Sequence, residues 1–147
     1  MNIEFLKLMF PELIPISKIA LGLLLSSLIG LERETTDKPM GLRGIMLVTL
    51  GTVLFTIIAL TLKDAPNLDM TRLLYAPIIG IGFLGSGVII EKKGHAQGIT
   101  TAAVLWAMVG IGLLTGLGMF NLAIVSTLAI YFILKLKMLE QRMLKND

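Results

Sequence analysis

Long apolar runs separated by short polar segments dominate the chain. The runs predict five membrane-crossing helices, at about residues 13–31, 44–62, 73–90, 99–117 and 122–136. The first four approach the roughly 20 residues that a helix needs to cross the hydrocarbon core of a bilayer. Their apolar residues are continuous and do not return at amphipathic spacing, so we expect these helices to contact lipid. Residues 1–10 mix apolar and charged side chains and predict a short interfacial helix.

Composition supports the membrane assignment. Of 147 residues, 55% are hydrophobic and 16% are charged, and the mean hydropathy is +0.86. A soluble bundle of this length has no outer layer with which to cover helices that are apolar on all sides. The chain contains no cysteine, which excludes disulfides and thiolate chemistry. The net charge of +3 comes from basic residues spread over loops and tail, so nucleic-acid binding is not expected.

The distribution of basic residues predicts the orientation in the membrane. Residues 32–43, 91–98 and 135–147 contain nine lysines and arginines, whereas residues 1–18 and 63–72 contain four. Segments rich in lysine and arginine usually stay in the cytoplasm. We therefore predict an all-α membrane protein of about five transmembrane helices, with its N-terminus outside and its C-terminus in the cytoplasm.

An internal repeat is a further hypothesis within a single transmembrane domain of residues 1–147. An offset of 57 positions superposes Gly30 on Gly87, Glu34 on Glu91 and Gly41 on Gly98. The repeat would relate a helical hairpin at residues 22–62 to a second one at 79–118.

Small residues recur at helical spacing in three of the predicted spans. They are Gly22, Ser26 and Gly30, then Gly80, Gly82, Gly85, Ser86 and Gly87, and finally Gly112 and Gly116. Such stripes predict close helix packing, within one chain or between the copies of a homodimer. Residues 80–85 also match the dinucleotide fingerprint, but they lie inside an apolar span, so nucleotide binding is not expected. The alternative is an unwound third helix whose free carbonyls line a cavity.

Thr49, Thr52 and Thr56 form a polar stripe on the second predicted helix. Threonine hydroxyls in membrane helices usually donate to a carbonyl of the preceding turn or to a neighbouring helix, which is our leading interpretation. A stripe that lines a solvated path is the alternative. No charged residue or histidine lies at the centre of a predicted span, which argues against an autonomous ion pump.

Polar residues gather where the predicted spans reach the expected cytoplasmic face. The candidate functional cluster is Glu32, Arg33, Glu34, Arg43, Glu91, Thr100, Thr101 and Trp106. Arg43 could offer its planar guanidinium to Glu32 or Glu34 and so order the first loop. The simpler interpretation of these charges is a solvated rim of the membrane interface.

Three carboxylates of this cluster are candidates for a metal site. Hydrated Mg²⁺ commonly binds one or two carboxylates, and these would be Glu32, Glu34 and Glu91. His95 is the only histidine, and it is not expected to bind metal. Without a Ser-His-Asp arrangement, a Walker loop or a paired-histidine motif, no catalytic residue, cofactor or enzymatic activity is predicted.

Two further members of the cluster have structural interpretations. Thr100 and Thr101 follow Gly98 at the start of the fourth span and are first interpreted as a helix cap. The indole N–H of Trp106 needs a hydrogen-bond acceptor, which predicts a position at a helix interface and not in lipid.

Four motifs in order resemble the MgtC/SapB family of bacterial membrane proteins. They are Gly30-Leu31-Glu32-Arg33-Glu34, Gly41-Leu42-Arg43, Gly80-Ile81-Gly82-Phe83-Leu84-Gly85-Ser86-Gly87, and Gly98-Ile99-Thr100-Thr101-Ala102-Ala103 with Trp106. The similarity extends from about Gly22 to Met119. The second motif of the family typically continues with threonine, whereas this chain has Gly44, so a role for that hydroxyl does not transfer.

The resemblance implies a multi-pass protein of the bacterial inner membrane that is linked to growth in low magnesium. It implies a non-enzymatic regulator that acts through other membrane proteins, and the MgtC branch is associated with inhibition of the F-type ATP synthase. Many members add a soluble C-terminal domain, and we expect this chain to correspond to the membrane module only. The rival hypotheses are a small Mg²⁺ transporter or channel with a broken third helix, and an assembly subunit whose role is packing.

Overall fold

The structure, a computed structural model, describes residues 12–66, 69–92 and 94–143, so the expected interfacial helix at residues 1–10 lies outside it. The elements are α2 (Leu13–Thr35), α3 (Leu42–Thr61), α4 (Met70–Val88), β1 (Ile90–Lys92), β2 (His95–Gln97), α5 (Ile99–Leu117) and α6 (Phe120–Met143). Helices α2 to α5 are long and apolar enough to cross a membrane, and residues Phe120–Leu136 of α6 form a shorter apolar helix. The predicted all-α membrane fold is confirmed.

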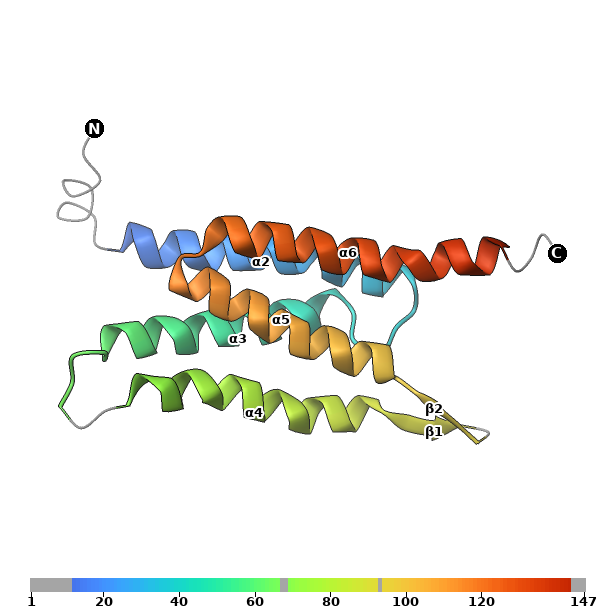
Figure 1. Cartoon of the computed structure of the whole chain (residues 1–147), viewed down its shortest axis with the longest axis horizontal. Helices are drawn as coiled ribbons and strands as arrows, with labels where there is room; N and C mark the ends of the chain where they lie inside the picture. The colour runs from blue at the N-terminus through green and yellow to red at the C-terminus, as the bar shows by residue number, and fades with distance from the viewer. Residues whose placement is uncertain (1–11, 67–68, 93, 144–147) are drawn as a thin grey trace.

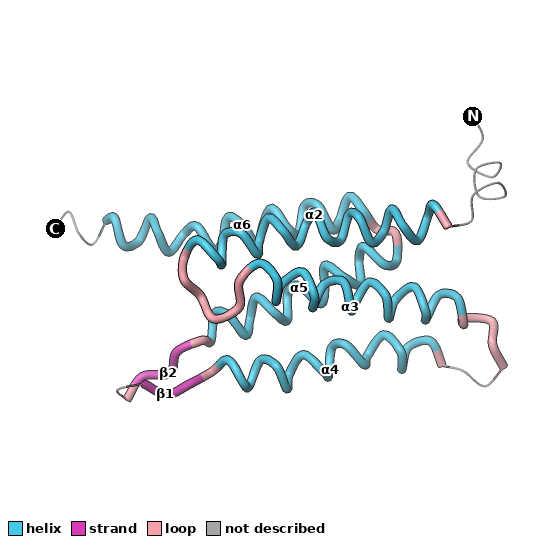
Figure 2. The backbone as a smooth tube through the Cα atoms, turned by 180° about the vertical axis from the view of Figure 1, so that it is seen from behind, coloured by secondary structure: helices cyan, strands magenta, loops and turns pink. Residues whose placement is uncertain are grey.

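The helices lie side by side and run up and down in chain order (Figure 1; Figure 2). Helix α5 contacts each of the other four helices and is the most buried of the candidate spans, whereas α4 is the least buried. The α2–α3 loop, the β-hairpin and the end of α6 share one end of the bundle (Figure 1). The described parts of the basic segments therefore lie at one end, as the predicted orientation requires. The orientation itself stays a prediction, as does the hairpin repeat.

The segment between α4 and α5 is a β-hairpin, whereas the sequence predicted only a short polar connection there. Helix α4 ends at Val88, and Ile90–Lys92 pairs antiparallel with His95–Gln97. Gly94 has a φ of +75° in the turn, and Gly98 has a φ of +92° at the base. A Cβ atom at Gly98 would overlap the carbonyl oxygen of Val88, so only glycine lets the hairpin close there.

The predicted stripes of small residues on α2 and α5 are confirmed as packing surfaces. A Cβ atom at Gly22 would lie 3.0 Å from the Val53 side chain, and one at Gly112 would lie 2.6 Å from Thr52 Cβ. A Cβ atom added at Gly116 would lie still closer to Thr56 Cβ. The glycine backbones of α2 and α5 therefore lie directly against side chains of α3. Small residues allow this close packing in membranes.

The glycine stripe on α4 behaves differently. Only Gly85 is buried, with Ala102 Cβ 3.6 Å from the position of an added Cβ. At Gly80, Gly82 and Gly87 an added Cβ would meet nothing within 4 Å, and Ser86 is exposed. The prediction that this stripe packs against a helix is thus wrong within the chain for all but Gly85. The unwound third helix is also wrong, because α4 is continuous from Met70 to Val88.

The threonine stripe on α3 follows the leading interpretation. Thr49 donates to the carbonyl of Ile45 at 3.1 Å, and Thr52 and Thr56 likewise donate to the carbonyls four residues earlier. All three side chains are buried, and two of them lie against Gly112 and Gly116 of α5. Helix packing occupies this surface, so the alternative of a solvated path along it is wrong.

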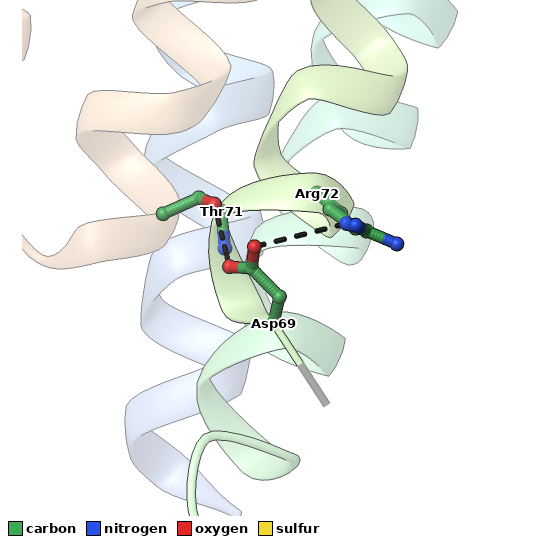
Figure 3. Close-up of polar contacts among 3 residues, drawn as sticks. All are labelled: Asp69, Thr71 and Arg72. Atoms are coloured by element: carbon green, nitrogen blue, oxygen red, sulfur yellow. Dashed lines mark hydrogen bonds and ion pairs between the residues drawn. The ribbon is translucent and has the colours of Figure 1, made fainter. Parts of the chain in front are cut away.

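Asp69 caps the N-terminus of α4 (Figure 3). Its carboxylate accepts hydrogen bonds from the Thr71 backbone N–H at 2.9 Å and from the Thr71 hydroxyl at 2.5 Å, and Arg72 Nε lies 3.8 Å from it. The hydrogen bond from the Thr71 hydroxyl is the main cause that lowers the pKa of Asp69 below its ordinary value, and the backbone bond adds to it. An anion here also complements the positive end of the helix.

We expect Asp69→Ala to loosen the first turn of α4. The lowered pKa means that the cap stabilises the folded state above the ordinary carboxyl pKa of about 3.9 and loses this contribution as pH falls through the lower folded-state value. Amide hydrogen exchange at Thr71 and Arg72 should become several-fold faster in the variant at neutral pH, and the difference from wild type should shrink below about pH 3.9. Equal exchange rates at neutral pH would contradict the capping role.

Candidate functional site

A buried hydrogen bond joins the end of α2 to the start of α5. Arg33 Nη2 donates to Thr101 Oγ1 at 2.7 Å, and the exposed fractions of the two side chains are 3% and 1%. This hydrogen bond links side chains of two different helices. Glu32, which is 6% exposed, precedes Arg33 on α2. We call Glu32, Arg33 and Thr101 the α2–α5 junction.

Close packing at Gly30 buries this junction. An added Cβ at Gly30 would lie 2.8 Å from Leu42 Cα, so the last turns of α2 lie directly against the start of α3. Ile29 and Ile45 are fully buried beside this contact. The last turn of α2 is consequently covered by protein, although its sequence is charged. The helix continues to Thr35, beyond the predicted span end at residue 31, because glutamate and arginine are good helix formers.

The predicted role of Thr100 and Thr101 as a helix cap is wrong. Gly98 occupies the N-cap position of α5, and no side chain caps this end. Thr100 is exposed, whereas Thr101 accepts the hydrogen bond from Arg33. The hydroxyl of Thr101 thus serves the contact with α2 and not the start of its own helix.

Glu34 orders the first loop in a way that the sequence interpretation missed. Its Oε2 accepts a hydrogen bond from the Leu42 backbone N–H at 2.9 Å, which caps α3 from the neighbouring helix. An added Cβ at Gly41 would overlap this oxygen, so Gly41 makes room for the carboxylate. Arg43 is exposed and forms no ion pair with Glu32 or Glu34, and the predicted Arg43 pairing is wrong. In the sequence, the glycine before Leu42 was the one sign that another group approaches the start of α3 closely.

The remaining candidates do not join the junction. Glu91 lies on β1, where all positions are exposed, and His95 lies on the exposed strand β2. Within the described ranges, no group of three or more histidine, cysteine or acidic side chains is placed to hold a metal ion. Glu32, Glu34 and Glu91 therefore do not form a three-carboxylate site for Mg²⁺ in this part of the chain.

Trp106 lies on the outer surface of the bundle, so the prediction of a buried helix interface is wrong. Its exposed fraction is 64%, whereas Leu105 and Met108 on the inner face of α5 are fully buried. It borders an apolar groove of about 410 Å³ between α4, α5 and α6. The lining also includes Gly110 and Ser126. The inner side of α5 is occupied by Leu105 and Met108, and the indole lies on the outer side of the helix.

Trp106 is the only tryptophan in the chain and reports directly on this surface. We expect phospholipids that carry bromine on their acyl chains to quench most of its fluorescence in reconstituted vesicles, because the ring is mostly exposed on an apolar face. Non-brominated vesicles provide the control. Fluorescence that brominated lipid leaves unchanged would show that another polypeptide covers the indole.

The fold and the junction define a multi-pass α-helical membrane protein with a buried charged contact at one end of its helices. Residues 19–142 match the model of the MgtC family, and the chain belongs to this family. The resemblance found in the four sequence motifs is thereby confirmed.

Several curated relatives support this assignment. The chain is 39% identical to Protein MgtC of Salmonella typhimurium, over 84% of this chain and 51% of that protein. It is 35% identical to Protein SapB of Bacillus subtilis, over 77% and 52% of the two chains, and 32% identical to the putative magnesium transporter YhiD of Escherichia coli, over 82% and 59%. The chain thus spans little more than half the length of these relatives. No solved structure matches it.

Proposed function

We propose that the chain is a non-enzymatic membrane module that supports magnesium homeostasis and growth in low magnesium through contacts with other membrane proteins. Membership of the MgtC family supports the link to magnesium. The observation that carries the proposal is the α2–α5 junction, where one family motif supplies Glu32 and Arg33, the only charged side chains that are buried in the described residues, and another supplies Thr101. Burying charge is costly, so a contact of this kind is usually kept for a role beyond packing.

The rest of the bundle favours contacts over conduction. Helix α4 is continuous, and α5 covers the threonine stripe of α3. The lipid-facing side of α4 leaves Gly80, Gly82 and Gly87 open, which offers a smooth surface to a second copy of the chain or to another membrane protein. By family resemblance, the F-type ATP synthase is a candidate partner, and the bacterial inner membrane is the proposed location.

Growth in low Mg²⁺ tests the role of the junction in a strain that needs this protein. We expect Arg33→Ala and Glu32→Ala, at normal membrane levels, each to reduce growth several-fold, whereas Arg43→Ala retains it because Arg43 is exposed and outside the junction. Normal growth of both junction variants would refute the assignment. If the junction variants reduce growth, crosslinking of the wild-type protein in native membranes identifies the partners.

The name of the Escherichia coli relative favours transport as the second candidate function. Purified protein in liposomes separates the two functions. Absence of flux across a panel of ions supports the regulatory module, whereas saturable Mg²⁺ flux would replace it with a transporter.

A further inference from the structure

The α2–α5 junction contains two buried polar atoms without a hydrogen-bonding partner. They are Glu32 Oε2, which can only accept, and Arg33 Nε, which can only donate. The side chains are 6% and 3% exposed. Buried polar atoms in folded proteins nearly always have a protein or water partner, because leaving one unpaired costs the free energy of removing it from water.

The Thr101 hydroxyl adds a third group, because its hydrogen is free to be donated. The buried threonines Thr49, Thr56, Thr115 and Thr127 each donate to the carbonyl four residues earlier. For Thr101 that residue is Gln97, which belongs to β2 and precedes the helix. The Thr101 oxygen accepts from Arg33, and within the described ranges its hydroxyl donates no hydrogen bond.

We propose that Glu32, Arg33 and Thr101 enclose one bound water molecule. The water oxygen accepts from Arg33 Nε–H and from the Thr101 hydroxyl, and a water hydrogen is donated to Glu32 Oε2. The site offers two donors and one acceptor, and a water molecule can bond to all three. Buried waters typically make about three hydrogen bonds. Glu32 Oε2 and Arg33 Nε each lack a hydrogen-bonding partner among the described residues, and the water supplies one to both.

Ions match the same three groups less well. A metal cation would face the positive charge of the Arg33 guanidinium, and an anion would face the negative charge of the Glu32 carboxylate. A neutral molecule that both donates and accepts satisfies all three groups.

Solid-state NMR of the full chain in liposomes tests the proposal. The chain has four arginines, so ¹⁵N-arginine labelling gives few Nε–H signals, and the signal of Arg33 is the one lost in Arg33→Lys. We expect magnetisation to pass from water to Arg33 Nε–H, while this proton exchanges at least tenfold more slowly with D₂O than those of the exposed Arg43 and Arg72. A direct Glu32 carboxyl contact within hydrogen-bond distance of Arg33 Nε, without transfer from water, would overturn it.

Two variants sharpen the result. Thr101→Ser keeps a hydroxyl and should keep the transfer from water, whereas Thr101→Val should reduce it at least twofold. Equal transfer in both variants would remove Thr101 from the site. If Thr101→Val does not fold, the wild-type measurement decides. The readout is independent of growth in low magnesium, so the water site and the proposed function can fail separately.

Discussion

Gly116→Ala is expected to destabilise the bundle by about 3 kcal/mol, the upper part of the usual range for overpacking a core. A Cβ atom at this position would overlap Thr56 Cβ and lie 2.7 Å from its Cγ2 and 3.0 Å from its Oγ1. Thr56 cannot rotate away easily, because it is β-branched and its hydroxyl donates to the Thr52 carbonyl at 2.8 Å. Helices α3 and α5 must therefore separate. The apparent melting temperature in detergent should fall by roughly 10 °C.

Gly110→Ala is the matched control on the same helix. An added Cβ at Gly110 meets nothing within 4 Å, so the substitution creates no overlap. Alanine is favoured over glycine in a helix interior by roughly 1 kcal/mol, so the melting temperature should stay unchanged or rise slightly. If both variants lowered the melting temperature equally, the loss would reflect glycine replacement in general, and the close α3–α5 contact would not be its cause.

The two variants also show what the sequence could and could not predict about packing. The length and apolarity of the runs predicted the helices, since both properties are local. The same spacing of small residues occurs on α4 and on α5, yet Gly116 meets a neighbour and Gly80 does not. Which stripe is covered depends on the position of a distant helix, and spacing along one helix carries no information about that position.

The α2–α5 junction also combines features that the local sequence predicts with features that depend on a distant helix. Charged residues after an apolar span predicted a solvated rim of the membrane interface, whereas Arg33 is buried and donates a hydrogen bond to Thr101, a residue of another motif. The burial of Arg33 was not predictable from its neighbours, because it depends on how closely Gly30 lets α2 approach Leu42. The β-hairpin was missed because three-residue strands are too short to show a period of two.

Thr101→Val is expected to cost about 2–3 kcal/mol, the upper part of the range for a lost hydrogen bond to a charged group. Valine nearly matches threonine in shape, so the change removes the hydroxyl and leaves the packing volume almost intact. Arg33 Nη2 then has no acceptor in a site where only 3% of its side chain reaches the surface. The melting temperature in detergent should fall by roughly 6–10 °C. Thr101→Ser should restore most of this loss, because serine keeps the oxygen that Arg33 needs.

Thr115→Val separates the loss of that hydrogen bond from the general effect of replacing a buried threonine. Thr115 is fully buried on the same helix, and its hydroxyl donates to the Ile111 carbonyl at 2.7 Å. That carbonyl lies within the helix and keeps its backbone hydrogen bond in the variant, so no group loses its only partner. We expect a cost of less than about 1 kcal/mol. Equal losses for Thr115→Val and Thr101→Val would mean that Arg33 gains little from Thr101, and the α2–α5 junction would then be held together by packing alone.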